Sequence, residues 1–279
     1  MRALPVYAWA GMLVMVVSEA GMFAKLEPFY TFHTPIAWTG YILCVDGWVW
    51  KRRGDSWLRD ARTEFLFLVI FSVPLWLVFE LFNLSIRNWH YIGLPESRPL
   101  RLLGYAWSFA TIWPAIFETG DLLASFRTSR VRSAGARLTR LTTGHWTSMT
   151  AGALMLVFPI VWPSRYLAAP VWLGFIFLLD PLNARLTGES LFAGTPAPAY
   201  ARAILLAWAG IICGLLWESW NYWAGAKWIY TVPIMENWKI FEMPVLGYLG
   251  FPAFALECFT MYVGLRWLLW RGARRPIPV

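Results

Sequence analysis

The sequence predicts an all-α fold: a polytopic transmembrane helical bundle of about eight helices in two parallel four-helix repeats. Three observations support this prediction: the composition, the apolar runs and a carboxylate pattern that occurs twice. Hydrophobic residues form 58% of the 279 residues and charged residues only 14%, and the mean hydropathy is +0.50. A soluble chain of this length cannot bury so much apolar surface, so we predict an integral membrane protein.

The apolar runs give the predicted helices in order. Several runs approach the ~20 residues that a helix needs to cross a bilayer. The eight runs are 4–23, 33–50, 64–84, 102–126, 146–163, 166–184, 202–223 and 243–270. The stretch between Asn183 and Tyr200 is rich in Gly and Pro and is predicted to be a loop. The last run begins with two prolines and two glycines over 244–252, which predicts a broken or re-entrant start.

Basic residues predict the orientation. They are concentrated in the connections 51–62 and 127–140 and in the tail after residue 270. With eight spans these segments share one side, which the positive-inside rule assigns to the cytoplasm. We therefore expect both termini to be cytoplasmic, in a bacterial cytoplasmic (inner) membrane. The predicted domains are a first four-helix membrane repeat (1–126) and a second one (145–270). A basic cytoplasmic linker (127–144) joins them, and a basic cytoplasmic tail (271–279) follows.

The net charge of +8 does not predict nucleic-acid binding. The arginines and lysines lie in short connections and form no basic helical face interleaved with aromatic residues. We predict no metal, because the three histidines are scattered and the three cysteines lie inside apolar runs without a C-x-x-C pair. No phosphate-binding glycine motif is present either, so no cofactor is predicted.

The repeat is predicted from a constant spacing. Glu80 and Asn83 recur as Glu218 and Asn221, each pair three residues apart and therefore on one helix face. The second pair lies 138 residues after the first, and Pro95 with Pro233 and Pro114 with Pro252 keep the same offset. The second and sixth runs agree approximately, since Trp38 with Trp172 and Asp46 with Asp180 are offset by 134.

Four buried carboxylates are the candidate catalytic residues: Glu80, Glu118, Glu218 and Glu257. Ionisable side chains at membrane depth are costly and are functional candidates by default. Glu118 and Glu257 each follow a proline by four or five residues, and we expect that proline to kink the helix beside a protonated acid. The alternative is structural: these carboxyls are neutral, hydrogen-bonded groups that hold helices together or satisfy helix ends.

Aromatic and amide side chains near these carboxylates are the candidate ligand-binding residues. We expect at least one repeat, preferably the second, to enclose a pocket lined by Trp and Tyr. The candidates are Asn83, Asn221, Trp217, Trp220, Trp228, Tyr230, Glu242 and Tyr248.

The last third of the chain resembles a known family. The stretch Glu218-x-x-Asn221, Trp228-x-Tyr230, Glu242-x-Pro244, Gly247 and onward to Glu257 is similar to the small integral-membrane carotenoid enzymes. These are the lycopene cyclases of the heterodimeric type and the related carotenoid hydratases. Residues 80–118 show a weaker form of the same resemblance. The resemblance implies acid–base chemistry on an isoprenoid or carotenoid-like substrate.

Three functions remain open from the sequence. In an enzyme, a buried Glu protonates a lipophilic substrate, and aromatic faces stabilise the resulting carbocation. In a transporter of a small molecule or lipid, parallel repeats and broken helices surround a polar site. In a non-catalytic role, the Trp-rich bundle binds pigment or lipid as a scaffold, an oligomer or a subunit of a larger membrane complex. Membrane lipids and a lipophilic small molecule are the expected partners in the first and third cases.

Overall fold

The computed structural model describes residues 2–127, 137–193 and 200–270. It confirms the all-α class, since most of this chain is helical. Two short strand pairs were not predicted; they lie in the connections at one end of the bundle. Parts of the predicted basic linker and the whole predicted tail lie outside the described residues. The helices are α1 (Val6–Phe23), α2 (His33–Arg53), α3 (Trp57–Asp60), α4 (Arg62–Ile86), α5 (Arg98–Ala110), α6 (Ile112–Ala124), α7 (Thr143–Val161), α8 (Ala168–Leu186), α9 (Tyr200–Trp223) and α10 (Gly250–Leu269).

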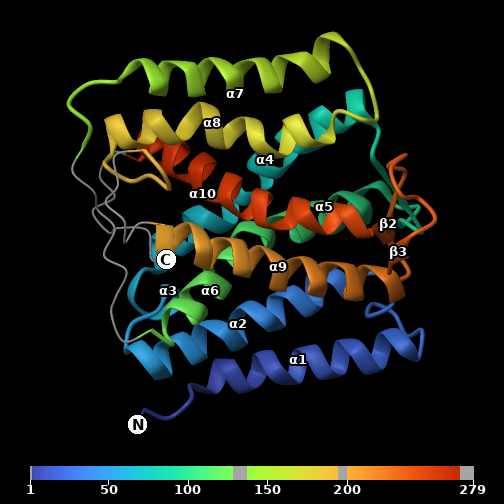
Figure 1. Cartoon of the computed structure of the whole chain (residues 1–279). Coiled ribbons are helices and arrows are strands. Elements are labelled where there is room, and N and C mark those ends of the chain that lie inside the picture. Colours follow the sequence, from blue (N-terminus) through green and yellow to red (C-terminus); the bar gives the residue numbers. More distant parts are fainter. Residues whose placement is uncertain (1, 128–136, 194–199, 271–279) are drawn as a thin grey trace.

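Five of the described helical segments are long and apolar enough to cross a membrane: α1, α4, α7, α9 and the segment Val245–Leu269. The long helices lie side by side (Figure 1), and α1 and α7 form opposite outer sides of the bundle. Many of their apolar side chains are exposed. These surfaces suit contact with lipid rather than with water.

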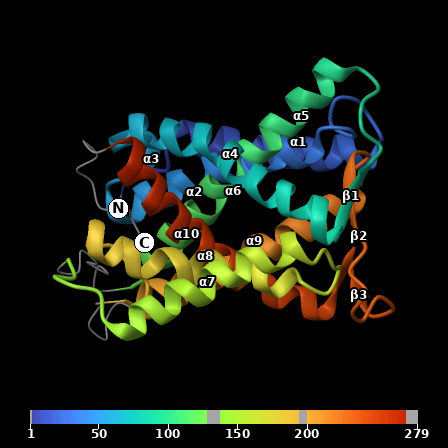
Figure 2. The same ribbon diagram turned by 90° about the horizontal axis from the view of Figure 1, so that it is seen from above.

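The strands gather at the end of the bundle opposite α3 (Figure 2). Strand β1 (Trp89–Ile92) pairs antiparallel with β2 (Lys227–Tyr230), and so links two connections far apart in sequence. Strand β3 (Lys239–Ile240) pairs with β4 (Met243–Pro244), and a 3₁₀ helix, η2 (Val245–Leu249), leads into α10. The start of the last run is therefore irregular, as its prolines and glycines predict.

The fourth apolar run, 102–126, is not one helix. It is divided at Thr111 into α5 and α6. Pro114 has no N–H with which to bond the carbonyl of Ala110, so the helical ladder is interrupted there. Ser72 of α4 bridges the break: its hydroxyl donates to the carbonyl of Phe109 and accepts from the backbone N–H of Trp113 at 3.2 Å.

The expected mid-helix proline kinks beside Glu118 and Glu257 are wrong. Pro114 is the third residue of α6, and Pro252 is the third residue of α10. Backbone N–H groups in a helix's first turn have no intrahelical partner, so a proline costs little there. Both prolines mark helix starts, and both glutamates lie about one turn further in.

The outer helices pack closely through glycines. A Cβ atom on Gly11 of α1 would lie 2.5 Å from the carbonyl oxygen of Gly40 on α2. A Cβ atom on Gly152 of α7 would lie 2.6 Å from the carbonyl oxygen of Gly174 on α8. Small residues that allow backbones to approach are typical of helix contacts in membranes.

Candidate functional site

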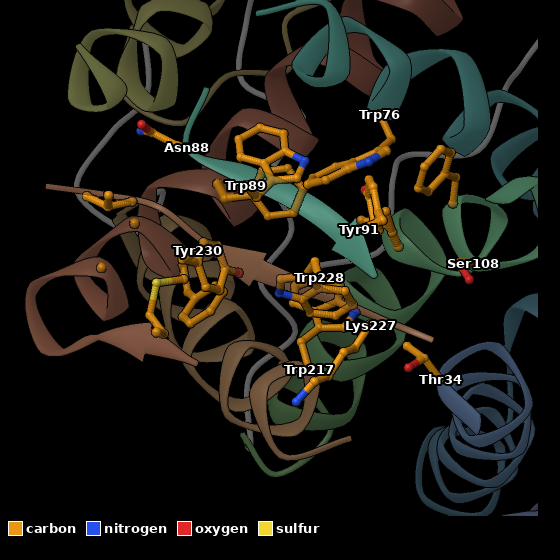
Figure 3. Close-up of a pocket in the computed structure, with 18 of the residues that line it drawn as sticks. Thr34, Trp76, Asn88, Trp89, Tyr91, Ser108, Trp217, Lys227, Trp228 and Tyr230 are labelled. Carbon is orange, nitrogen blue, oxygen red and sulfur yellow. The ribbon is translucent and has the colours of Figure 1, made fainter. Parts of the chain in front are cut away.

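A cavity of about 540 Å³ opens at the strand end of the bundle. Its lining is mostly apolar, is rich in aromatic residues and comes from both halves of the chain, whereas we expected a pocket enclosed by one repeat. Figure 3 shows aromatic rings from α4, α9, β1 and β2 gathered there. The aromatic lining includes Trp38, Trp76, Trp89, Tyr91, Tyr105, Phe109, Tyr166, Trp172, Trp217, Trp228, Tyr230, Phe251 and Phe254.

The β1–β2 pair supplies one aromatic face of this cavity. Trp89 pairs with Tyr230 and Tyr91 pairs with Trp228. Side chains two residues apart on a strand point to the same face, and so do side chains directly opposite each other across a pair. All four rings therefore share one face, and all four line the cavity.

Glu80 lies behind this face from the first half. Its Oε1 accepts three hydrogen bonds: from Trp76 Nε1 at 2.9 Å, Trp89 Nε1 at 3.1 Å and the Tyr91 hydroxyl at 2.5 Å. The three donors line the cavity, but Glu80 does not. Glu80 therefore orients three cavity-facing aromatic side chains.

Glu218 has the corresponding place in the second half. It is fully buried, and its Oε1 accepts a hydrogen bond from the Tyr230 hydroxyl at 2.9 Å. The Trp228 side chain and the backbone N–H of Met243 lie close to the same carboxyl group. Glu218 also lies outside the cavity lining, so the tyrosine hydroxyl stands between the carboxyl group and the cavity.

Both tyrosines have strongly perturbed acidity. Burial, followed by the negative charge of Glu80, raises the pKa of Tyr91 well above its ordinary value. Burial and the charge of Glu218 do the same to the pKa of Tyr230. Both hydroxyls are therefore protonated at physiological pH and donate to their glutamates.

Asn83 and Asn221 do not bond their neighbouring glutamates. The Asn83 amide donates to the carbonyl of Trp89 at 2.8 Å and accepts from the N–H groups of Asn88 at 2.8 Å and Trp89 at 3.2 Å. The Asn221 amide donates to the carbonyl of Trp228 at 2.9 Å and accepts from its N–H at 2.8 Å. Each amide fixes the start of a strand and so positions its aromatic residues.

Glu118 and Glu257 lie elsewhere in the bundle. Both are fully buried, but neither lines the cavity. Glu118 lies beside Asp46 of α2 and Asp121 of its own helix. Glu257 Oε1 accepts from the backbone N–H of Phe175 on α8 at 3.1 Å. These contacts link helices and lie apart from the aromatic cavity.

Of the other predicted ligand-binding residues, some line the cavity and some contact other parts of the protein. Trp217 lines the cavity together with Trp228 and Tyr230. Trp220 instead donates to Glu19 at 2.7 Å. Glu242 forms an ion pair with Lys227 at 3.0 Å. The Tyr248 hydroxyl donates to the carbonyl of Ile240 at 2.9 Å. Within the described chain, no group of His, Cys, Asp and Glu side chains is arranged to hold a metal ion.

Sequence reasoning missed several cavity residues. Trp38 and Trp172 were noted as a repeated pair but not as site residues, and both line the cavity. Phe79 does not line the cavity, but its ring stacks on that of Trp172 with the ring centroids 5.0 Å apart. Arg101 and Arg165 also line the cavity, although no motif marks them. For Trp38 and Trp172 the repeated spacing was a sequence signal that could have marked them as site residues.

Comparison with known proteins adds no family: no protein-family model, curated protein or solved structure matches this chain.

Proposed function

We propose that this chain is an integral membrane protein whose aromatic cavity binds a lipophilic, isoprenoid or carotenoid-like ligand. The observation that carries the proposal is one apolar cavity beside two tyrosine hydroxyls, each held by a glutamate. Its volume of about 540 Å³ lies within the ~300–1,000 Å³ of small-molecule sites. Flat aromatic walls suit an elongated unsaturated chain.

The proposal includes two parallel four-helix repeats. Matched contacts support it: Tyr91 with Glu80 and Tyr230 with Glu218 are equivalent hydrogen bonds. Asp46 accepts from the backbone N–H of Leu58 at 2.9 Å, and Asp180 accepts from three backbone N–H groups over 191–193. In this arrangement the cavity lies near the non-cytoplasmic surface of a bacterial inner membrane, and both termini are cytoplasmic.

The chemistry we favour is general acid–base catalysis by the Tyr–Glu pairs. For turnover Glu218 must be protonated, and the Tyr230 hydroxyl must turn from its resting hydrogen bond with Glu218 toward the ligand. Tyr230 then transfers its proton to a carbon of a ligand double bond, while Glu218 transfers its own proton to the phenolic oxygen. The ligand becomes a carbocation, the carboxyl group becomes a carboxylate, and Tyr230 is unchanged. Loss of another ligand proton to the carboxylate gives an isomer or ring, whereas addition of water with loss of its proton gives a hydrated product. The surrounding Trp faces stabilise the cation.

A second candidate is binding without turnover. Neither Glu80 nor Glu218 lines the cavity, and each already accepts a hydrogen bond from its tyrosine. In that case the glutamates only orient the rings, and the protein is a pigment- or lipid-binding scaffold.

Glu218→Gln and Tyr230→Phe distinguish the two candidates. Gln keeps the size and most hydrogen bonding of Glu but has no ionisable proton, and Phe keeps the ring but has no hydroxyl. The variants are expressed in a carotenoid-producing bacterial host, and the extracted isoprenoids are identified by mass spectrometry. We expect a product that is an isomer or a hydrate of a host isoprenoid with the wild type only, while both variants fold and retain the ligand.

The controls separate catalysis from folding. Trp220→Phe alters a nearby residue that does not line the cavity and should leave the product profile unchanged. If the wild type converts no isoprenoid but retains one, the scaffold role is correct. Equal loss of folded protein from Glu218→Gln and Glu218→Ala would assign Glu218 a structural role.

A further inference from the structure

The charged residues of the cavity are all cationic. Among its lining residues only Arg101, Arg165 and Lys227 are charged, and no carboxylate lines it. They come from three separate parts of the chain: the first turns of α5, the connection before α8, and β2. An apolar chamber for an uncharged hydrocarbon has no need of a cationic lining of this kind.

The three cations differ in how they are balanced. The ammonium of Lys227 donates to Glu242 at 3.0 Å and to the carbonyl of Tyr222 at 3.1 Å, so its charge is paired. Arg101 donates to the carbonyl of Glu96 at 3.3 Å. Within the described ranges, neither Arg101 nor Arg165 forms an ion pair with a carboxylate. Arg101 and Arg165 therefore both line the cavity without an ion pair to a carboxylate of the described chain.

The start of α8 adds to this positive potential. Ala168 and Ala169, its first two residues, line the cavity. No side chain caps this helix start, so its first N–H groups are available to an acceptor. Thr34 also lines the cavity, is buried, and has a hydroxyl without a hydrogen-bond partner in the described chain. The lining thus combines aromatic walls with donors that suit an anion.

We infer that the ligand is a single-chain amphiphile whose anionic head, a carboxylate or phosphate, lies at Arg101 and Arg165 while its apolar chain occupies the aromatic cavity. Arginine binds both kinds of head through paired N–H donors. This inference rests on the proposed lipophilic ligand and specifies its class: the ligand is an acid or a phosphate ester, not a neutral hydrocarbon.

Retinoic acid and retinol are a matched pair of probes, because they share a polyene chain and differ in the head group. Both quench Trp fluorescence by energy transfer, and Trp residues surround the cavity. Binding is measured with the full chain in phosphatidylcholine nanodiscs at about pH 8, where the carboxylate is ionised. We expect retinoic acid to bind about ten-fold more tightly than retinol, because it gains two charge-assisted contacts.

The double variant Arg101→Gln/Arg165→Gln should lose this preference and keep the wild-type affinity for retinol. Arg98→Gln is the matched control, because Arg98 begins the same helix, α5, but does not line the cavity; it should keep the preference. Equal binding of both probes by the wild type, or a preference that survives in the double variant, would overturn the head-group inference alone. Binding of neither probe would overturn the proposed lipophilic site as well.

A second arm distinguishes the ligand head from a bilayer lipid. The titration is repeated in nanodiscs in which part of the phosphatidylcholine is replaced by phosphatidylglycerol. We expect the preference for retinoic acid to persist. If the anionic phospholipid abolishes it in the wild type, the arginines bind membrane head groups and the inference is wrong.

Discussion

Trp89 lies directly opposite Tyr230 in the antiparallel pair of β1 and β2. This pairing joins the connection after α4 to the connection after α9, and it brings two Tyr–Glu hydrogen bonds to one cavity. A ligand that spans the aromatic face would therefore meet one such pair from each half. The relationship makes the strand pair, short as it is, the element on which the proposed site depends.

The asparagines that begin the strands should matter for stability. Asn83→Ala and Asn221→Ala leave buried backbone groups without partners, at a cost of about 1–3 kcal/mol each. We expect both variants to have lower thermal unfolding midpoints in detergent, whereas Ser85→Ala, on the same helix as Asn83, should not. Unchanged midpoints in the asparagine variants would contradict the positioning role.

The glycine contact between α7 and α8 provides a second test. A Cβ atom on Gly152 would lie 2.4 Å from the backbone nitrogen of Leu178, so Gly152→Ala must push the helices apart, at a cost of about 1–3 kcal/mol. Gly144 is on the same helix and has only one ordinary contact, at 3.8 Å. Gly144→Ala should therefore leave the unfolding temperature nearly unchanged, and equal effects would show that α7 does not pack on α8 as described.

Tyrosine ionisation tests the environment of the two hydroxyls. Since the pKa values of Tyr91 and Tyr230 are raised well above the usual value, neither should ionise with ordinary tyrosines near pH 10. The folded Tyr91→Phe/Tyr230→Phe variant should match the wild type in tyrosinate absorbance up to about pH 11. In denaturant the wild type should show two more tyrosinates than the variant. A smaller folded signal in the variant would indicate that these hydroxyls titrate normally.

The raised pKa values of Tyr91 and Tyr230 also determine how the free energy of unfolding changes with pH. The unfolded chain loses these tyrosine protons first, at about pH 10, so the two groups stabilise the fold below that pH and the contribution is lost as pH rises. The double Phe variant should therefore show a weaker decline in stability above about pH 10 than the wild type.

Single cysteines test the predicted orientation. In a chain whose three native cysteines are replaced, Trp238→Cys should react with an impermeant maleimide on intact cells, because this connection is predicted to face outward. Arg140→Cys should react only after the membrane is permeabilised. The reverse pattern would place the cavity at the cytoplasmic side.

Sequence reasoning identified Glu80 and Glu218 better than it identified the cavity. Glu80 with Asn83 and Glu218 with Asn221 recur at an offset of 138 residues, so these glutamates were recognisable without a structure, although their tyrosine partners were not predicted. The helices, however, are apolar on nearly every face, and hydrophobic periodicity then does not reveal which side faces a cavity. This is why Glu118 and Glu257 were grouped with Glu218, although they contact other helices.

The pairing of β1 with β2 also could not be predicted from the local sequence pattern. Four-residue strands carry little signal of their own, and their partners lie about 140 positions apart. The side-chain amides of Asn83 and Asn221 bond backbone groups five to seven residues later, which spacing on a helix face does not predict. The proline positions were visible, but the place of Pro114 in the first turn of α6 depended on the helix break at Thr111, which only the structure reveals.

The central claim is that the aromatic cavity holds an isoprenoid-class ligand, and identification of the bound molecule tests it most directly. Wild type and Ala253→Trp, which fills a lining position, are purified in parallel and their extracts are analysed by mass spectrometry. We predict a stoichiometric isoprenoid or polyene in the wild type and its loss from the folded variant. Ordinary phospholipid alone in both extracts would contradict the account.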